Sequence, residues 1–72
     1  MKLQQIRAFC AVVDHDMSVS RAARALHTTQ SAVSKQVGQL EDSLGVALLI
    51  RAKSRLLGLT DVGRQVLQCM RG

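Results

Sequence analysis

The chain runs VSRAARALHTTQSAVSKQV from residue 19 to residue 37, and this stretch decides the fold. Its first half repeats apolar residues at spacings of three and four, which predicts a short helix with the inward stripe Val19, Ala22, Ala23 and Leu26. A three-residue connection, residues 27–29, separates it from a second helix. Ala23 is small where two helices must approach closely, and Val33 follows ten positions later. The spacing predicts a helix-turn-helix.

Polar and glycine residues mark the ends of these two helices. Ser18 or Ser20 can cap the first, because a side-chain oxygen there accepts an otherwise unpaired backbone N–H. Thr29 is well suited to cap the second. Gly45 ends it, because a residue without Cβ readily takes the left-handed conformation. The second helix is therefore expected over residues 30–44, with the apolar face Val33, Val37, Leu40 and Leu44.

Outside this pair, the pattern predicts a helix at each end of the chain and a ribbon. The first helix ends near Asp14 and has the apolar face Leu3, Ile6, Phe9, Cys10 and Val13. Residues 46–50 form a strand, residues 52–55 a polar connection and residues 56–59 a returning strand. Thr60 caps a fourth helix. The expected fold is mainly α, a winged helix-turn-helix with a three-helix core and a two-stranded wing.

The charge distribution favours a polyanionic partner. Ten Lys and Arg face five Asp and Glu, for a net charge of +5. Residues 17–40 and 43–60 contain basic residues and no acid, whereas an ordinary solvated surface would interleave both signs. Phe9 is the single aromatic residue of the sequence, which disfavours single-stranded nucleic acid because that needs aromatic stacking platforms. The expected partner is double-stranded DNA.

The outer face of the second helix carries groups that can contact bases. Short hydrogen-bonding side chains and one cation gather at its N-terminal end, namely Gln30, Ser31, Ser34 and Lys35. A helix that enters the major groove presents its first residues to base edges. A helix that is merely solvated usually carries more Glu and Lys. The wing adds the cations Arg51, Lys53 and Arg55 for the backbone or the minor groove. Arg21 and Arg24 either approach phosphates or are solvated.

Two other function classes are weighed against DNA binding. An enzyme needs a nucleophile beside a base or paired carboxylates in a cleft. His15 and His27 have no convergent partner, so no catalytic residue and no enzyme is expected. A winged helix can also bind proteins instead of nucleic acid. That alternative predicts an exposed apolar patch on the second helix of the pair or on the wing.

Cysteine usage and hydropathy limit the cofactor and the compartment. Cys10 and Cys69 are isolated and lie at apolar-periodic positions, so reduced thiols are expected. The sequence has no Cys-x-x-Cys pair and no cluster with metal-ligand spacing, so neither a metal nor a cofactor is expected. No apolar run approaches a membrane span, and a cytoplasmic location is expected.

The sequence as a whole resembles the N-terminal domain of LysR-type transcriptional regulators. The matching stretches are Ser20-Arg21-Ala22-Ala23, Leu26-His27-Thr28-Thr29-Gln30, Ala32-Val33-Ser34, Leu40-Glu41-Asp42-Ser43-Leu44-Gly45-Val46, Leu48, Arg51 and Leu59-Thr60-Asp61-Val62-Gly63. Two positions depart from the family pattern. Ser31 replaces a usual proline, and Leu49 replaces a usual phenylalanine. The start of the chain, residues 34–37 and a long 51–60 connection are similar to the branch that regulates cysteine biosynthesis and sulfur use.

The resemblance implies an assembly larger than this chain. Residues 1–60 would form the DNA-binding domain, and residues 61–72 would begin a linker helix. From the apolar face of this fourth helix we expect dimerisation through Val62, Val66 and Met70. The family resemblance further implies a homodimer or tetramer on an interrupted palindrome. A small-molecule effector would bind a C-terminal domain that is not among these residues. By the same resemblance, Thr29 caps the helix that enters the major groove.

Overall fold

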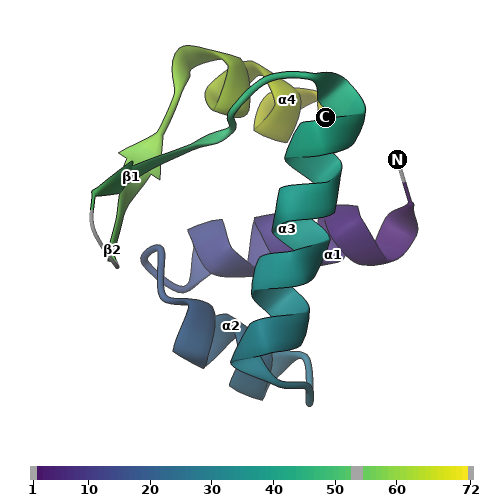
Figure 1. Ribbon diagram of the computed structural model, residues 1–72, viewed down its shortest axis with the longest axis vertical. Helices are drawn as coiled ribbons and strands as arrows, with labels where there is room; N and C mark the ends of the chain where they lie inside the picture. Colours follow the sequence, from purple (N-terminus) through teal and green to yellow (C-terminus); the bar gives the residue numbers. More distant parts are fainter. Residues whose placement is uncertain (1, 53–54, 72) are drawn as a thin grey trace.

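The computed structural model describes residues 2–52 and 55–71. Within these residues the chain forms three helices, then a ribbon of two strands, and then a fourth helix (Figure 1). In chain order the elements are α1 (Leu3–Asp14), α2 (Val19–Ala25), α3 (Gln30–Leu44), β1 (Leu49–Ala52), β2 (Arg55–Leu59) and α4 (Asp61–Arg71). The fold is the expected winged helix-turn-helix. No helix in the described ranges is long and apolar enough to cross a membrane.

Helices α1, α2 and α3 enclose the core. Phe9 is fully buried and lies among aliphatic side chains from all three helices, with Ala22 and Ala23 at the crossing of α2. Small side chains at this crossing let the helix backbones approach closely, as the sequence predicts. Leu48 and Leu49, at the start of the wing, are also buried and close the core from that side. Burial of aliphatic surface is therefore the main stabilising term.

The ends of α2 and α3 follow the predicted caps. Of the two candidate serines, Ser18 caps α2, because its hydroxyl accepts a hydrogen bond from the N–H of Arg21 at 3.1 Å. The Thr29 hydroxyl accepts one from the N–H of Ala32 at 3.1 Å and starts α3. Gly45 ends α3 with φ at 71°. These local bonds fix the length and direction of α3.

The wing is an antiparallel pair whose first strand starts later than expected. Its register pairs Leu49 with Leu59 and Ala52 with Arg55, and Leu57 is an extra residue in β2. The expected strand 46–50 is wrong at both ends, because β1 covers Leu49–Ala52. Before Leu49 the backbone is bonded elsewhere, since the Ala47 carbonyl accepts from Thr60 and the Leu48 N–H donates to Glu41. β2 likewise begins at Arg55 instead of residue 56.

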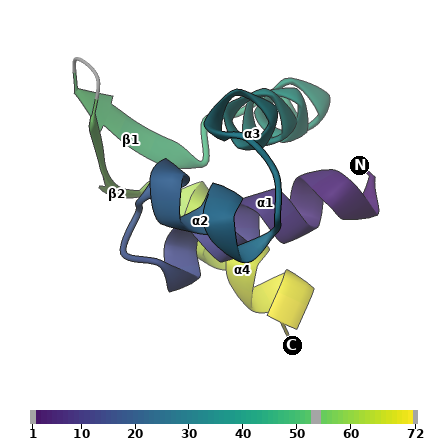
Figure 2. The ribbon, with the colours of Figure 1, turned by 90° about the horizontal axis from the view of Figure 1, so that it is seen from below.

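Helix α4 begins against the base of the wing. The Thr60 hydroxyl accepts from the N–H of Gly63 at 2.9 Å and donates to the carbonyl of Ala47 at 2.8 Å. Thr60 is thus the predicted cap, and it also ties α4 to the segment before β1. Seen from below, α1 lies between α3 and α4 (Figure 2). Val66 and Leu67 pack against the core from this far side.

Candidate nucleic-acid interface

The first turns of α3 present the polar face predicted from the sequence. Val33 and Val37 are buried, which turns the other sides of the helix outward. The side chains at the predicted base-reading positions are all exposed, namely Thr29, Gln30, Ser31, Ser34 and Lys35. Within the described part of the chain, Lys35 makes no ion pair. The arrangement offers uncharged donors and acceptors plus one available cation at the positive end of a helix.

A tight turn sets the start of α3 against α2. The N–H of Thr28 donates to the carbonyl of Ala23 at 2.9 Å, and His27 has a φ of 56°. This left-handed conformation is uncommon for a residue with a Cβ, although histidine adopts it more often than most. His27 is exposed, in keeping with a turn residue. The turn places the start of α3 at one end of the molecule (Figure 1).

The cations of α2 are weaker candidates for this interface than the residues of α3. Arg21 is exposed and lies 3.9 Å from the carboxylate of Asp16, which is also exposed. Such a solvated pair contributes little to stability. Arg24 is exposed in the last turn of α2. Both residues stay secondary candidates for phosphate contact.

The predicted wing cations differ in what the structure says of them. Lys53 lies outside the described residues. The structure places Arg55 at the start of β2, opposite Ala52. Arg51 lies on β1, where its guanidinium is bonded to Glu41 and its side chain is 46% exposed. Among the predicted wing cations, Arg51 alone has a side chain that the structure describes, and that side chain is paired with Glu41.

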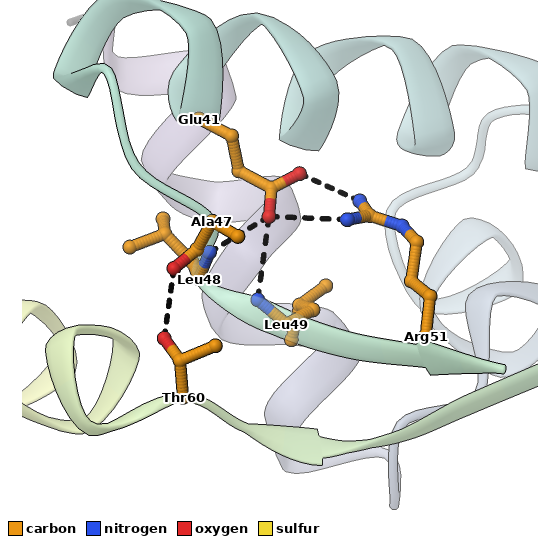
Figure 3. A network of polar contacts seen from close by, with 6 residues as sticks. All are labelled: Glu41, Ala47, Leu48, Leu49, Arg51 and Thr60. Carbon is orange, nitrogen blue, oxygen red and sulfur yellow. Dashed lines mark hydrogen bonds and ion pairs between the residues drawn. The ribbon is translucent and has the colours of Figure 1, made fainter.

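Glu41 is the functional residue that sequence reasoning missed. Its side chain is only 10% exposed and accepts four hydrogen bonds (Figure 3). One oxygen, Oε2, accepts from the N–H of Leu48 at 2.7 Å and of Leu49 at 3.3 Å. A signal was present, since residue 41 follows Val37 by four positions on the apolar face of α3.

The same network sets the ionisation of Glu41. Burial raises the pKa of this carboxyl, but the hydrogen bonds from Arg51 and from the backbone of Leu48 and Leu49 outweigh burial. The pKa of Glu41 therefore lies below its ordinary value, and the group is a carboxylate at neutral pH. Its hydrogen bond to Arg51 raises the pKa of the guanidinium in turn.

The wing also exposes apolar side chains. Ile50 on β1 is 45% exposed and Leu57, the extra residue of β2, is 62% exposed. An exposed apolar patch on the wing is what the protein-binding alternative predicts. The two residues do not interrupt the polar face of α3, but they keep that alternative under test.

The predicted dimer residues are divided by α4. Val62 is 39% exposed, whereas Val66 packs against the core of its own chain. The side chain of Met70 lies outside the described residues. The outer face of α4 instead carries exposed polar residues such as Arg64, Gln65 and Gln68. Of the two predicted dimer residues whose side chains the structure describes, Val62 is the exposed one.

Comparisons with known proteins agree on one family. The model of bacterial regulatory helix-turn-helix proteins of the lysR family matches residues 3–64. The chain is 48% identical over 68 residues to the HTH-type transcriptional regulator CysB of Thiocapsa roseopersicina, covering 94% of this chain and 50% of that protein. It is 46% identical over 68 residues to the regulator SsuR of Burkholderia cenocepacia, covering 94% and 22%. The RuBisCO operon transcriptional regulator of Allochromatium vinosum is 47% identical over 66 residues, covering 92% and 21%.

A solved structure with DNA has the same fold. The DNA-binding domain of CbnR, in complex with DNA, superposes with a TM-score of 0.88 at 34% identity, covering 99% of this chain and 79% of that one. The chain spans only half or less of the length of the curated relatives it matches. With the family model covering almost the whole sequence, the chain belongs to the LysR family of bacterial helix-turn-helix regulators.

Proposed function

We propose that this chain binds double-stranded DNA with the start of α3 in the major groove. The observation that carries the proposal is the exposed set Gln30, Ser31, Ser34 and Lys35 at the capped N-terminal end of a helix whose other face is buried. Gln can bond bidentately to adenine, and the small Ser side chains permit close approach to base or backbone. Lys35 can neutralise a phosphate or reach a guanine edge. The CbnR domain, which was solved with DNA, supports this use of the fold.

In this proposal the wing supplies charge rather than sequence choice. Lys53 and Arg55 belong to the connection and start of β2 and would lie on the sugar-phosphate backbone or in the minor groove. Contacts of this kind release counterions, so they weaken with salt for every sequence alike. Arg51 was expected among these cations from its position in the sequence, but its guanidinium is bonded to Glu41.

For the whole protein we infer a cytoplasmic transcriptional regulator that acts as a dimer or tetramer on an interrupted palindrome. Val62 on α4 is the described apolar residue available for self-association. A small-molecule effector would bind beyond residue 72. The relatives named CysB and SsuR support target genes of sulfur and cysteine metabolism. Sedimentation of this domain tests self-association, because a monomer at every attainable concentration would contradict dimerisation through α4.

Binding to a randomised duplex pool tests the proposal. Selected sequences and their scrambled controls are titrated by fluorescence anisotropy across a salt series. We expect an interrupted palindrome and steep salt dependence. Gln30→Ala and Ser34→Ala should reduce the preference for the selected sequence, whereas Lys35→Ala should lower the salt slope by about 0.9 if it meets one phosphate. Half-sites from sulfur-metabolism operons and from RuBisCO operons are compared in the same titration, and the tighter-bound set identifies the target genes.

A second candidate function has the exposed Ile50 and Leu57 in its favour. A winged helix that binds protein would use such side chains on the wing. If no duplex binds at low salt while the domain stays folded, the DNA proposal fails. Loss of a protein contact on changing Leu57→Ser, with α3 variants unaffected, would then favour this second function.

A further inference from the structure

One carboxylate joins the recognition helix to the wing. Glu41 belongs to α3, whose first turns carry the base-facing residues, and its oxygens hold the first residues of the wing (Figure 3). The N–H groups of Leu48 and Leu49 donate to Oε2. Arg51 donates from both terminal nitrogens, at 2.6 Å to Oε1 and 3.2 Å to Oε2. The relative placement of α3 and β1 thus depends on this group.

Arg51 is committed to this carboxylate. Two parallel N–H···O bonds give a planar guanidinium a fixed geometry on a carboxylate. The paired carboxylate already offsets the charge of Arg51, and a phosphate that displaced Glu41 would leave this largely buried acid without its cation. A buried carboxylate without its cation is strongly disfavoured. The contact between Arg51 and Glu41 is therefore expected to persist when DNA is bound.

The wing needs such an anchor. An isolated two-stranded ribbon is marginally stable in water, and this one pairs through few residues with an irregular register at Leu57. At the base of β1, the backbone is held by Glu41 on one side and by the Thr60 hydroxyl, bonded to Ala47, on the other. Without Glu41, the N–H groups of Leu48 and Leu49 lose their acceptor, and the ribbon loses its direction relative to α3.

We propose that Arg51 is a positioning residue, which locks Glu41 onto the base of β1 and so sets the wing at its angle to α3, and that it does not itself neutralise a DNA phosphate. This inference rests on the proposed function, since the wing matters only if it meets DNA. The lock itself exists in the free domain and can be measured there. The proposed function and the role of Arg51 can therefore be refuted separately.

Hydrogen exchange in the free domain tests the lock. The amides of Leu48 and Leu49 are followed by NMR in the wild-type chain, in Arg51→Ala and in the control Arg64→Ala, which removes an exposed cation from α4. Arg51→Ala removes the charged hydrogen bonds that hold Glu41 in place. Such bonds are strong enough that the protection of the Leu48 and Leu49 amides should fall about tenfold or more. Arg64→Ala should leave it unchanged. Unaltered protection in Arg51→Ala would overturn the inference.

DNA binding separates positioning from phosphate contact by the sign of one effect. If Arg51 positions the wing, Glu41→Gln and Arg51→Ala both weaken binding to the selected duplex, about tenfold each, and the double variant is no weaker than Arg51→Ala. If Arg51 meets a phosphate, Glu41→Gln frees the guanidinium and removes a negative charge, so binding is retained or tightened. That second result would overturn the inference.

Arg51→Lys gives the same decision without a substitution at Glu41. Lysine keeps the charge that a phosphate needs but cannot form the two-pronged bond to a carboxylate. Positioning predicts that Arg51→Lys loses nearly as much affinity as Arg51→Ala, whereas a phosphate contact predicts that it keeps most of it. Thermal melts confirm that each variant is folded. Should the wild-type domain bind no duplex, the proposed function fails, and the exchange rates of Leu48 and Leu49 still decide whether Arg51 holds the wing.

Discussion

Gly63→Ala should destabilise the domain by about 2 kcal/mol, although alanine is the better helix former. A Cβ at residue 63 would overlap the carbonyl oxygen of Leu48 and would lie 3.2 Å from the Thr60 hydroxyl oxygen. The obstacle at Leu48 is backbone, so α4 or the base of the wing has to move. Overpacking of this kind costs about 1–3 kcal/mol, and an overlap with backbone belongs at the upper end of this range. The better helix propensity of alanine returns about 1 kcal/mol, which leaves a net loss of about 2 kcal/mol.

Thermal unfolding followed by circular dichroism measures this effect. A loss of about 2 kcal/mol lowers the Tm of a domain of this size by roughly 8–16 °C. Gly38→Ala is the matched control, because Gly38 lies inside α3 and a Cβ there meets nothing within 4 Å. It should raise stability by about 1 kcal/mol. A Gly63→Ala domain as stable as wild type, beside a stabilised Gly38→Ala, would refute the close approach of α4 to Leu48.

Substitutions at three further residues test local features. Thr60→Val removes the hydroxyl that caps α4 and binds Ala47, so urea unfolding should show a loss of about 1–2 kcal/mol; an unchanged midpoint would speak against this double role. His27 has a φ of 56°, so His27→Val should cost about 1–2 kcal/mol in the same assay, whereas His27→Gly should cost none, and equal effects would contradict a left-handed turn. The pKa of Glu41 is lower in the folded chain than its ordinary value, so its stabilisation is present above about pH 4.3 and is lost as the pH falls through the folded pKa. Glu41→Gln should therefore flatten the loss of stability with acid, and an unaltered acid limb would argue against the network.

Local chemistry in the sequence predicted the helices well. Thr29 and Gly45 mark the ends of α3, because a capping hydroxyl and a left-handed glycine act within a few residues of their positions. Asp14 ends α1 for a similar local reason, as the apolar period stops there. The outward set at the start of α3 followed from the same periodicity, since burial of Val33 fixes which side is exposed.

Bonds between distant residues were beyond the sequence pattern. The wing begins at Leu49, and not at residue 46, because Glu41 and Thr60 take up the backbone groups before it. Arg51 counted as a wing cation because its partner lies ten positions away and on another element. The apolar face of α4 suggested a dimer surface, but Val66 packs on its own core. Periodicity identifies an apolar face without identifying what covers it.

The most direct test of the central claim is NMR mapping of a selected duplex onto the domain. If α3 is the recognition helix, the largest amide shifts fall at Gln30, Ser31, Ser34 and Lys35, with a second group at the start of β2. Amides of α1 and the outer face of α4 should change little. Shifts concentrated on α1 or α4, with the start of α3 unchanged, would contradict a recognition role for α3.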